Sequence, residues 1–433
     1  MDDTIFALSS GNVPSGVSII RLSGPNALCI AEKLAGALPP PRQCKLTNLV
    51  DPESNDLIDR ALVMTFSEPA SFTGEDIVEF HCHGSRPVLN KLFETLNRFD
   101  KCRLADAGEF SRRAFENGKL DLTEIEGLSD LIAAETEAQR VLALRQTGGQ
   151  LRTLYESWRH DLIRCRALIE AELDFSDEED VPGGVSDQVW KQVAGLIGQI
   201  SGHLDDSRQG EILRDGFRVV LSGPPNAGKS SLLNALARRD VAIVTPVAGT
   251  TRDVIDVDLD LGGIKVTMSD TAGMRASDDL IEQEGMRRAL QAADQADLVL
   301  WLEVPGEQSD LLPPDGAVRV WTKSDLLSTD PVKDSLSINT IEKDGLSHLL
   351  EFLTSRLQKF ADLSEAPIIT RQRHRSSLEQ CLVHLGDCGK DHMDIEFRSE
   401  HLRRAADCLG QITGRVDVED LLDVIFAEFC VGK

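Results

Sequence analysis

Gly223-Pro224-Pro225-Asn226-Ala227-Gly228-Lys229-Ser230 matches the phosphate-binding pattern G-x-x-x-x-G-K-[ST]. The apolar residues 219–221 before it predict a strand, and residues 231–238 after it predict a helix, which is the order that this loop requires. Glycines let successive backbone N–H groups face a phosphate, and the helix N-terminus adds partial positive charge. We therefore expect Lys229 to contact the β and γ phosphates of a nucleotide as a catalytic residue, and Ser230 to bind Mg²⁺.

Two downstream segments extend this nucleotide site. Asp270-Thr271-Ala272-Gly273 ends the next predicted strand, where an aspartate can hold Mg²⁺ through water and a glycine amide can approach the γ phosphate. Thr322-Lys323-Ser324-Asp325 follows the predicted strand 318–321 and resembles the guanine-reading motif N-K-x-D, with threonine in place of asparagine. Asp325 would accept two hydrogen bonds from guanine and leave a donor of adenine unsatisfied, which predicts selectivity for GTP. Asn339-Thr340 stands where such proteins usually carry Ser-Ala.

The position after Asp270-Thr271-Ala272-Gly273 is Met274, where many GTPases place a glutamine that orients the attacking water. Methionine cannot do this, so another residue must organise hydrolysis. Arg275, Glu282 and Glu284 lie downstream as candidates, and each is equally well interpreted as a solvated helix charge.

The rest of the chain predicts a multidomain α/β plus α protein. Strands alternate with helices from 217 to about 360, which is typical of a parallel, doubly wound sheet. Apolar residues at helical spacing predict long helices before and after this segment. We expect an N-terminal α+β domain (1–118), a helical domain in two parts (119–210 and 363–433) and a nucleotide-binding domain inserted between them (211–362).

Composition limits the alternatives. A chain of 433 residues is too long for one core, and its net charge of -26 argues against broad electrostatic binding along nucleic acid. No apolar stretch is long enough to span a bilayer, and the N-terminus lacks the pattern of a targeting peptide, so we expect a soluble cytoplasmic protein without a membrane partner. The nine cysteines form no C-x-x-C pair and are expected to be reduced thiols.

Several further segments are similar to those of one family. They are Asp3-Thr4-Ile5, Ile20-Arg21-Leu22-Ser23-Gly24, Ser71-Phe72-Thr73-Gly74-Glu75-Asp76, Gly108-Glu109-Phe110-Ser111-Arg112-Arg113-Ala114-Phe115, Asn117-Gly118-Lys119-Leu120-Asp121-Leu122, Ala248-Gly249-Thr250-Thr251-Arg252-Asp253 and Phe429-Cys430-Val431-Gly432-Lys433. Together they resemble the MnmE (TrmE) family, the GTPases that take part in modifying the wobble uridine of certain tRNAs. The last segment resembles the F-C-x-G-K ending of that family.

The resemblance implies a potassium-dependent GTPase whose GTPase domains dimerise in the GTP state. By matching positions, Glu282 positions the catalytic water and Ser230 and Thr251 bind Mg²⁺. The positions that match the potassium site are Asn226, Thr245, Val247 and Thr250. A monovalent cation beside the phosphates can replace an arginine finger, which would explain Met274. The expected nucleotide contacts are Asn226, Ala227, Gly228, Lys229, Ser230, Ser231, Thr245, Pro246, Val247, Ala248, Gly249, Thr250, Thr251, Asp270, Thr271, Ala272, Gly273, Thr322, Lys323, Ser324, Asp325, Asn339 and Thr340.

The N-terminal domain of the family binds a tetrahydrofolate derivative, in its 5-formyl or methylene form, as a one-carbon donor. The matching residues are Arg21, Glu79, Lys119 and Lys433, and cations with one carboxylate suit a glutamate tail and a pterin. Taken singly, each is more often a surface charge. Residues 9–15 depart from the turn that is usual in the family. Cys430 is either a reactive thiol or a packed residue.

The resemblance also implies partners. The expected assembly is a homodimer that joins the FAD-dependent protein MnmG in a heterotetramer or larger complex and acts on tRNA. Aminomethyl or carboxymethylaminomethyl groups are then installed at C5 of uridine 34, and GTP hydrolysis drives the conformational change. Two other classes stay open: a GTP-switched ribosome or assembly factor without one-carbon chemistry, and a folate-dependent transferase with a merely structural nucleotide site.

Overall fold

The chain divides into two compact units. The computed structural model describes residues 2–174, 185–205, 207–243, 256–270, 296–306, 311–324, 336–342, 344–361, 367–389, 394–416, 419–427, 429 and 432. The first unit contains Met1–Ser129, Thr147–Arg166 and Leu402–Lys433, and the second contains Asp130–Gln146 and Ala167–His401. Both units are therefore built from segments that are distant in the sequence.

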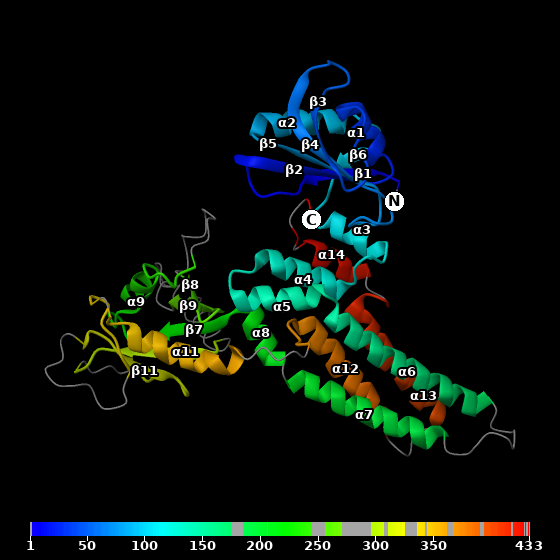
Figure 1. The fold of residues 1–433 in the computed structure, drawn as a ribbon. Helices are drawn as coiled ribbons and strands as arrows, with labels where there is room; N and C mark the ends of the chain where they lie inside the picture. Colours follow the sequence, from blue (N-terminus) through cyan, green and yellow to red (C-terminus); the bar gives the residue numbers. More distant parts are fainter. Residues whose placement is uncertain are drawn as a thin grey trace, which may run out of the picture. The chain divides into compact units, whose positions relative to one another are not determined.

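The first unit contains a six-stranded sheet in the order β3-β4-β5-β2-β1-β6, in which only β1 and β6 are known to pair in parallel (Figure 1). The elements of its N-terminal part are β1 (Thr4–Leu8), β2 (Ser15–Ser23), α1 (Ala27–Ala35), β3 (Cys44–Val50), β4 (Leu57–Phe66), β5 (Ile77–Gly84), α2 (Arg86–Asn97), β6 (Cys102–Leu104) and α3 (Glu109–Glu116). The expected α+β character of this part is confirmed.

One face of this sheet is covered by α1 and α2. Alternate residues of β2 and β5, such as Ile20 and Phe80, are fully buried against Leu34 of α1 and Leu92 of α2. Because side chains alternate across a strand, the intervening residues Arg21, Glu79 and His81 lie on the opposite face. The sheet therefore presents polar side chains on the face that the two helices leave open.

Helix α4 (Leu122–Ala133) begins with a capping box formed by Asp121, the residue before the helix, and Glu124. Its Oδ1 accepts hydrogen bonds from Thr123 Oγ1 and the Glu124 backbone N–H, both at 2.8 Å, and its own N–H donates to Glu124 Oε2 at 2.8 Å. Burial raises the pKa of Asp121 to about 6 from its ordinary value of 3.8, although the hydrogen bonds oppose this shift.

We expect Asp121→Asn to change how stability depends on pH. The folded state binds the Asp121 proton more tightly than the unfolded state does. The protonated carboxyl therefore stabilises the folded state fully below the unfolded pKa, and this stabilisation is lost as the pH rises through about 6. The free energy of unfolding of the wild type should fall relative to the variant by about 1 kcal/mol between pH 5 and pH 7. Urea titrations of both proteins at the two pH values measure this difference, and a constant difference would contradict the assignment.

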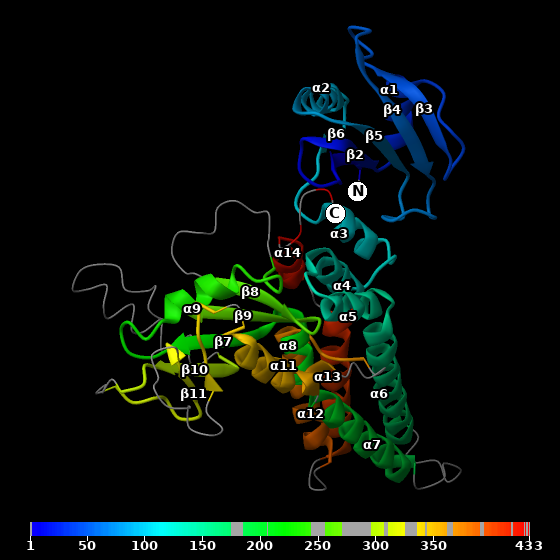
Figure 2. The same cartoon turned by 60° about the vertical axis from the view of Figure 1, so that its left-hand side comes forward.

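The second unit contains a six-stranded sheet in the order β12-β11-β10-β7-β9-β8 (Figure 2). Its elements are β7 (Phe217–Ser222), α9 (Lys229–Leu236), β8 (Asp256–Leu261), β9 (Ile264–Asp270), β10 (Leu298–Glu303), β11 (Val318–Trp321), β12 (Leu336–Ser337) and α11 (Ser347–Ala361). All neighbouring strands pair in parallel except β8, which is antiparallel to β9. The predicted parallel pairing is observed between all neighbouring strands except at one edge, which the sequence did not indicate, where a two-glycine turn at 262–263 folds β8 back onto β9.

Helices α9 and α11 pack on one face of this sheet. Leu232 and Leu353 share a buried cluster with Val219, Val266 and Leu300, which lie at alternating strand positions. The helices that would cover the other face of a doubly wound sheet fall within 271–295 and 325–335, which lie outside the described residues. That second layer stays a prediction.

Long helices complete both units. They are α5 (Glu137–Thr147), α6 (Gln150–Asp174), α7 (Val185–Asp205), α8 (Ser207–Asp215), α12 (Gln372–Cys388), α13 (Ile395–Thr413) and α14 (Glu419–Ala427). Within the second unit, the Arg398 guanidinium of α13 stacks 3.6 Å from the ring centroid of Trp190 of α7.

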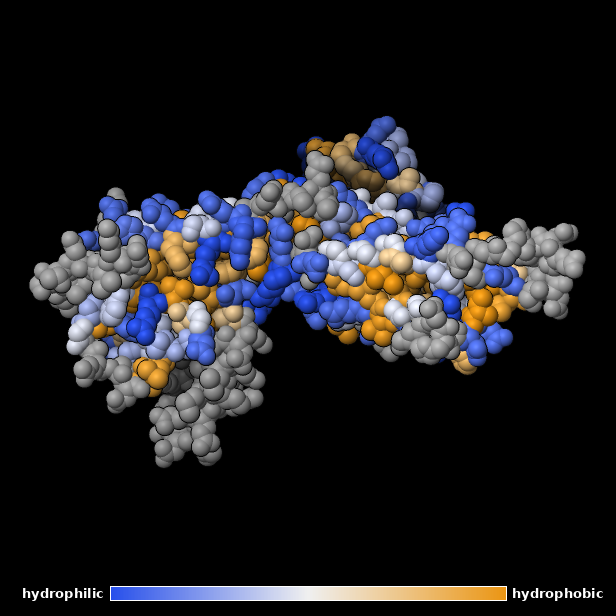
Figure 3. All heavy atoms as spheres, turned by 90° about the horizontal axis from the view of Figure 1, so that it is seen from below, coloured by the Kyte–Doolittle hydropathy of each residue, from blue (hydrophilic) through white to orange (hydrophobic). Residues whose placement is uncertain are grey.

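The surface mixes apolar and polar side chains. Figure 3 shows hydrophobic patches interspersed with hydrophilic ones on one face. In α12 and α13, Val383 and Phe397 are 63% and 61% exposed. Among the described helices, none combines the length and the apolarity needed to cross a bilayer.

Candidate functional site

The phosphate loop connects β7 to α9 through a backbone that favours glycine. Gly223 and Gly228 have φ values of 139° and 94°, and Asn226 has a φ of 62°. A Cβ atom at Gly223 would collide with the carbonyl oxygen of Leu302 in the neighbouring strand β10. The loop can therefore pass close to the sheet only because residue 223 has no side chain.

Lys229, the first residue of α9, has its ammonium group inside the loop. Its Nζ donates to the carbonyl oxygens of Gly223 at 2.8 Å and Pro224 at 2.9 Å, and the residue is only 6% exposed. A phosphate group in the loop would present oxygens that accept from the same ammonium. The positive charge is thus already located where an anionic ligand would bind.

The predicted Mg²⁺ ligand Ser230 meets Asp270 at the end of β9. Ser230 Oγ donates to Asp270 Oδ2 at 2.8 Å, and Asp270 is 2% exposed. The two residues come together because β7 and β9 are adjacent, with Leu221 opposite Asp270 in the register. A hydroxyl and a carboxylate are oxygen donors of the kind that Mg²⁺ prefers, so this pair fits the expected ion.

Thr322, in the segment expected to contact guanine, supports the phosphate loop. Its hydroxyl lies 2.8 Å from the Ala227 carbonyl oxygen and 3.2 Å from that of Glu303, and the residue is 3% exposed. A single hydroxyl hydrogen serves these two acceptors, so the shorter contact carries most of the interaction. The short threonine side chain therefore still ties this segment to the phosphate loop.

The loop around Asn339 lies beside the same site. Asn339 Oδ1 accepts from the Ile341 backbone N–H at 2.9 Å, which makes the buried side chain a local turn element rather than a free ligand contact. Thr340 and Ser231, both expected to contact nucleotide, line one open pocket of about 630 Å³. The backbone N–H of Ser324 donates to the Ile338 carbonyl oxygen at 3.3 Å, which joins the two segments that are expected to contact the base.

Several expected site residues lie outside the described residues. They are Thr245, Pro246, Val247, Ala248, Gly249, Thr250, Thr251, Thr271, Ala272, Gly273, Glu282, Asp325, Cys430 and Lys433. Of the predicted potassium ligands the structure describes Asn226, whose backbone forms part of the phosphate loop.

A second group of expected site residues lies on the open face of the N-terminal sheet. Arg21 of β2 and Glu79 of β5 are direct cross-strand neighbours, and Arg21 Nε donates to Glu79 Oε1 at 3.0 Å. The Arg21 guanidinium also lies 5.7 Å from the ring centroids of Phe72 and Phe110. His81 Nε2 lies 3.3 Å from the other oxygen of Glu79. A charged and aromatic cluster of this kind suits a planar, hydrogen-bonding ligand.

Lys119 lies against the loop that carries Phe72. Its Nζ donates to the Pro69 carbonyl oxygen at 2.9 Å, and its aliphatic stem borders Gly74. Two predicted folate residues thus contact the loop 69–74. Arg21 lies against the ring of Phe72, and Lys119 donates to the Pro69 carbonyl oxygen. The aromatic residues Phe72 and Phe110 were not predicted as site residues, although both lie in segments that carry the family resemblance.

The C-terminal segment reaches the N-terminal sheet within the same unit. Ser9 Oγ donates to the Gly432 carbonyl oxygen at 2.8 Å. Gly432 has a φ of 104°, and a Cβ atom there would collide with the carbonyl oxygen of Leu8. The unusual turn at residues 9–15 therefore supplies the hydroxyl that holds the last described residue beside the end of β1.

Comparisons with known proteins agree with this arrangement. The family model described as "GTP-binding protein TrmE N-terminus" matches residues 4–119, and the one described as "MnmE helical domain" matches residues 122–430. A Rhizobium johnstonii protein named "tRNA modification GTPase MnmE" is 52% identical over 438 residues, which cover 100% of this chain and 99% of that protein. Proteins of the same name from Agrobacterium fabrum and Rhizobium meliloti are each 51% identical, with the same coverage. With both family models and full-length relatives matched, the chain belongs to the MnmE (TrmE) family of GTPases.

Proposed function

We propose that this protein is a GTP hydrolase that acts in tRNA modification, the activity that the names of its relatives state for them. The observation that carries the proposal is the meeting of a buried lysine, a hydroxyl and a buried carboxylate at the phosphate loop, at Lys229, Ser230 and Asp270. Lys229 would stabilise negative charge on the β and γ phosphates. Ser230 and Asp270, with Thr251, would hold Mg²⁺.

Hydrolysis in this proposal depends on residues that replace the glutamine missing at Met274. Glu282 orients the attacking water. Asn226, Thr245, Val247 and Thr250 would hold a potassium ion, whose positive charge would stabilise the negative charge that develops in the transition state. Asn226 supports this assignment by its place in the loop that surrounds Lys229.

The potassium site predicts that GTP hydrolysis is faster in KCl than in NaCl at equal ionic strength. A smaller ion cannot satisfy a set of oxygen ligands spaced for potassium, so we expect a loss of about tenfold or more in NaCl, on the scale of one transition-state contact. Steady-state phosphate release measures the rate in each salt. Equal rates would remove the cation site from the proposal.

Tetrahydrofolate binding is proposed at Arg21, Glu79, Lys119 and Lys433. The ion pair between Arg21 and Glu79, which are 22% and 13% exposed in their side chains, supports this because it leaves polar groups accessible on the open face of the sheet. When bound, the folate supplies the one-carbon unit. Arg21 would orient its polar groups together with the rings of Phe72 and Phe110.

A homodimer is proposed on the same open face. Leu46 and Leu62 form a cross-strand pair on this face and are 51% and 43% exposed. Exposed leucines beside a polar ligand site suit a contact with a second copy of the chain. The dimer would join the FAD-dependent MnmG and modify C5 of uridine 34 of tRNA in the cytoplasm. Each chain would contain an N-terminal domain (1–118), a helical domain in two parts (119–210 and 363–433) and an inserted GTPase domain (211–362).

The test of the function is mass spectrometry of tRNA nucleosides from cells that lack this protein. Aminomethyl-type groups at C5 of the wobble uridine should vanish, return with the wild-type gene, and stay absent with Lys229→Ala. Lys359→Ala, a lysine on α11 that stacks on Phe360, serves as the matched control and should restore them. If the modified nucleosides persist without the gene, the GTPase assignment stands and the tRNA-modification proposal falls.

A further inference from the structure

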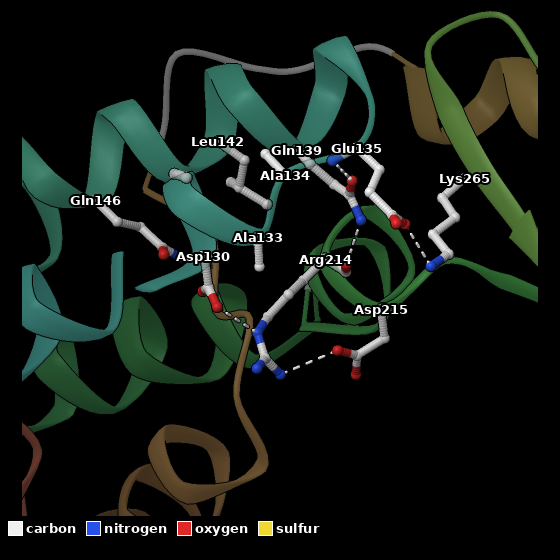
Figure 4. Close-up of a pocket in the computed structure, with 11 residues that line it drawn as sticks. Asp130, Ala133, Ala134, Glu135, Gln139, Leu142, Gln146, Arg214, Asp215 and Lys265 are labelled. Atoms are coloured by element: carbon white, nitrogen blue, oxygen red, sulfur yellow. Dashed lines mark hydrogen bonds and ion pairs between the residues drawn. The ribbon is translucent and has the colours of Figure 1, made fainter. Parts of the chain in front are cut away.

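The GTPase sheet of the second unit is connected to its helices by two chain segments, and both meet at one carboxylate. The chain enters the sheet through α8, which ends at Asp215, and leaves it after α11 through residues 367–371, which lead into α12. Asp130 Oδ1 accepts from Arg214 Nε at 3.1 Å and from Arg371 Nη2 at 2.7 Å. Figure 4 shows the contact between Asp130 and Arg214. The Asp130 side chain thus connects the end of α8, which leads into the sheet, with residues 367–371, which lead out of it.

A second contact joins the same region to the edge of the sheet. The Gly263 carbonyl oxygen, in the turn between β8 and β9, accepts from the Ala138 backbone N–H in α5 at 3.1 Å. Lys265 Nζ lies 2.6 Å from Glu135 Oε2 and 3.0 Å from Asp258 Oδ2. Burial opposes the charge on Lys265, but these two carboxylates outweigh it and raise its pKa.

Strand β9 links this contact to the nucleotide site. Lys265 lies near its start, and Asp270, the partner of Ser230, is its last residue. Five residues of extended chain span roughly 17 Å. Strand β9 is paired on both sides, by β7 and β8, so a displacement of Asp270 on nucleotide binding would be carried along the strand toward the turn at Gly263.

The contacts surround a cavity that gives the ion pairs room to change. It has a volume of about 260 Å³, and its lining includes Asp130, Glu135, Gln139, Arg214 and Lys265 (Figure 4). Within the described part of the chain, Asp130 Oδ2 is buried without a hydrogen-bond partner. Arg214 Nη1 also donates to Asp215 Oδ1 at 3.0 Å. Asp130 therefore has an acceptor oxygen that a second donor could reach, and Arg214 already has a second carboxylate partner in Asp215.

We propose that Asp130 is a positioning residue that couples the nucleotide state of the GTPase sheet to helices α5 and α12 of the same unit. This inference rests on the proposed function, because the nucleotide is taken to be GTP. Asp130 acts through Arg214 and Arg371 and does not contact the nucleotide. Its loss should separate GTP hydrolysis from the downstream reaction.

The test compares Asp130→Asn with the wild type in the full-length protein. Asparagine keeps the shape of the side chain and removes the charge that holds two arginines. We expect GTP hydrolysis to stay within about threefold of the wild type, and tRNA modification to fall about tenfold, since coupling residues typically contribute at this scale. The matched control is Glu137→Gln, because in the described part of the chain Glu137 forms a local ion pair with Arg140 on the exposed surface of α5. This control should change neither activity.

A second readout does not depend on tRNA. Hydrogen exchange should differ between the GDP-bound and the GTP-analogue-bound wild type at residues 136–146 and 367–375, and this difference should disappear in Asp130→Asn. If the variant keeps the difference, or loses hydrolysis to the same degree as tRNA modification, the coupling role is overturned. If the wild type shows the nucleotide-dependent difference but modifies no tRNA, the coupling stands and the proposed function fails.

Discussion

Lys229→Ala is expected to lower the turnover number of GTP hydrolysis by roughly a thousandfold, the scale of losing a preorganised charge at the transition state. In the structure the ammonium group is held by the Gly223 and Pro224 carbonyl oxygens at 2.8 and 2.9 Å, so it is positioned before the nucleotide arrives. Alanine leaves the loop without a charge at the β and γ phosphates. Phosphate release at saturating GTP and Mg²⁺ measures the loss.

The control for this prediction is Lys359→Ala, which removes one lysine from α11 and leaves the phosphate loop intact. It should hydrolyse GTP at the wild-type rate. Circular dichroism of both variants should match the wild type, because the contacts of the Lys229 ammonium with the Gly223 and Pro224 carbonyl oxygens are local to the phosphate loop. A Lys229→Ala variant that retained more than about a third of the wild-type rate would show that this loop is not the hydrolytic site.

Arg113→Met should destabilise the first unit by about 3–5 kcal/mol, the cost of breaking a buried ion cluster from one side. Arg113 is 1% exposed. Its Nη1 donates to the Asp3 carbonyl oxygen at 2.9 Å and lies 3.2 Å from both Glu75 oxygens. Its Nη2 donates to Asp3 Oδ1 and Glu109 Oε1, both at 3.0 Å. Methionine would fill the volume and leave these carboxylates close together with less compensating charge.

The neighbouring arginine provides a matched comparison. Arg112 is 39% exposed in its side chain and pairs with Glu116 and Asp423 at the surface, so Arg112→Met should cost less than about 1 kcal/mol. Urea dependence of hydrogen exchange in β1 and β5 measures both variants in the intact chain. Equal losses for the two variants would show that the buried cluster has no special role.

The strand β7, the phosphate loop and the helix α9 were the part of the fold most readily predicted from the sequence. A strand, a glycine-containing loop and a helix occur in uninterrupted order, so local patterns determine the positions of Lys229 and Ser230. The antiparallel edge strand β8 was missed because alternating helices and strands predict parallel pairing, and the turn at Gly262 and Gly263 was not recognised as a hairpin signal.

Side-chain clusters made by distant segments could not be predicted in the same way. Asp130 and Arg371 are separated by 241 positions, and no periodicity relates them. Arg21 and Glu79 were identified through the family resemblance, whereas their contacts with Phe72 and Phe110 depend on how loops fold over the sheet. Thr322 stands where asparagine is usual, and only the geometry shows that its hydroxyl reaches the Ala227 carbonyl oxygen.

The first unit is built from chain segments that are far apart in the sequence, and this has a consequence for synthesis on the ribosome. Leu122 and Ile125 of α4 pack against Leu422 and Phe426 of α14, but residues 167–401 belong to the second unit and are translated in between. At ~5–20 residues per second this interval lasts roughly 10–50 s. During that time the nascent N-terminal part presents an apolar surface that α14 has yet to cover. Chaperone binding to ribosome-bound chains should therefore persist until the final helix has emerged.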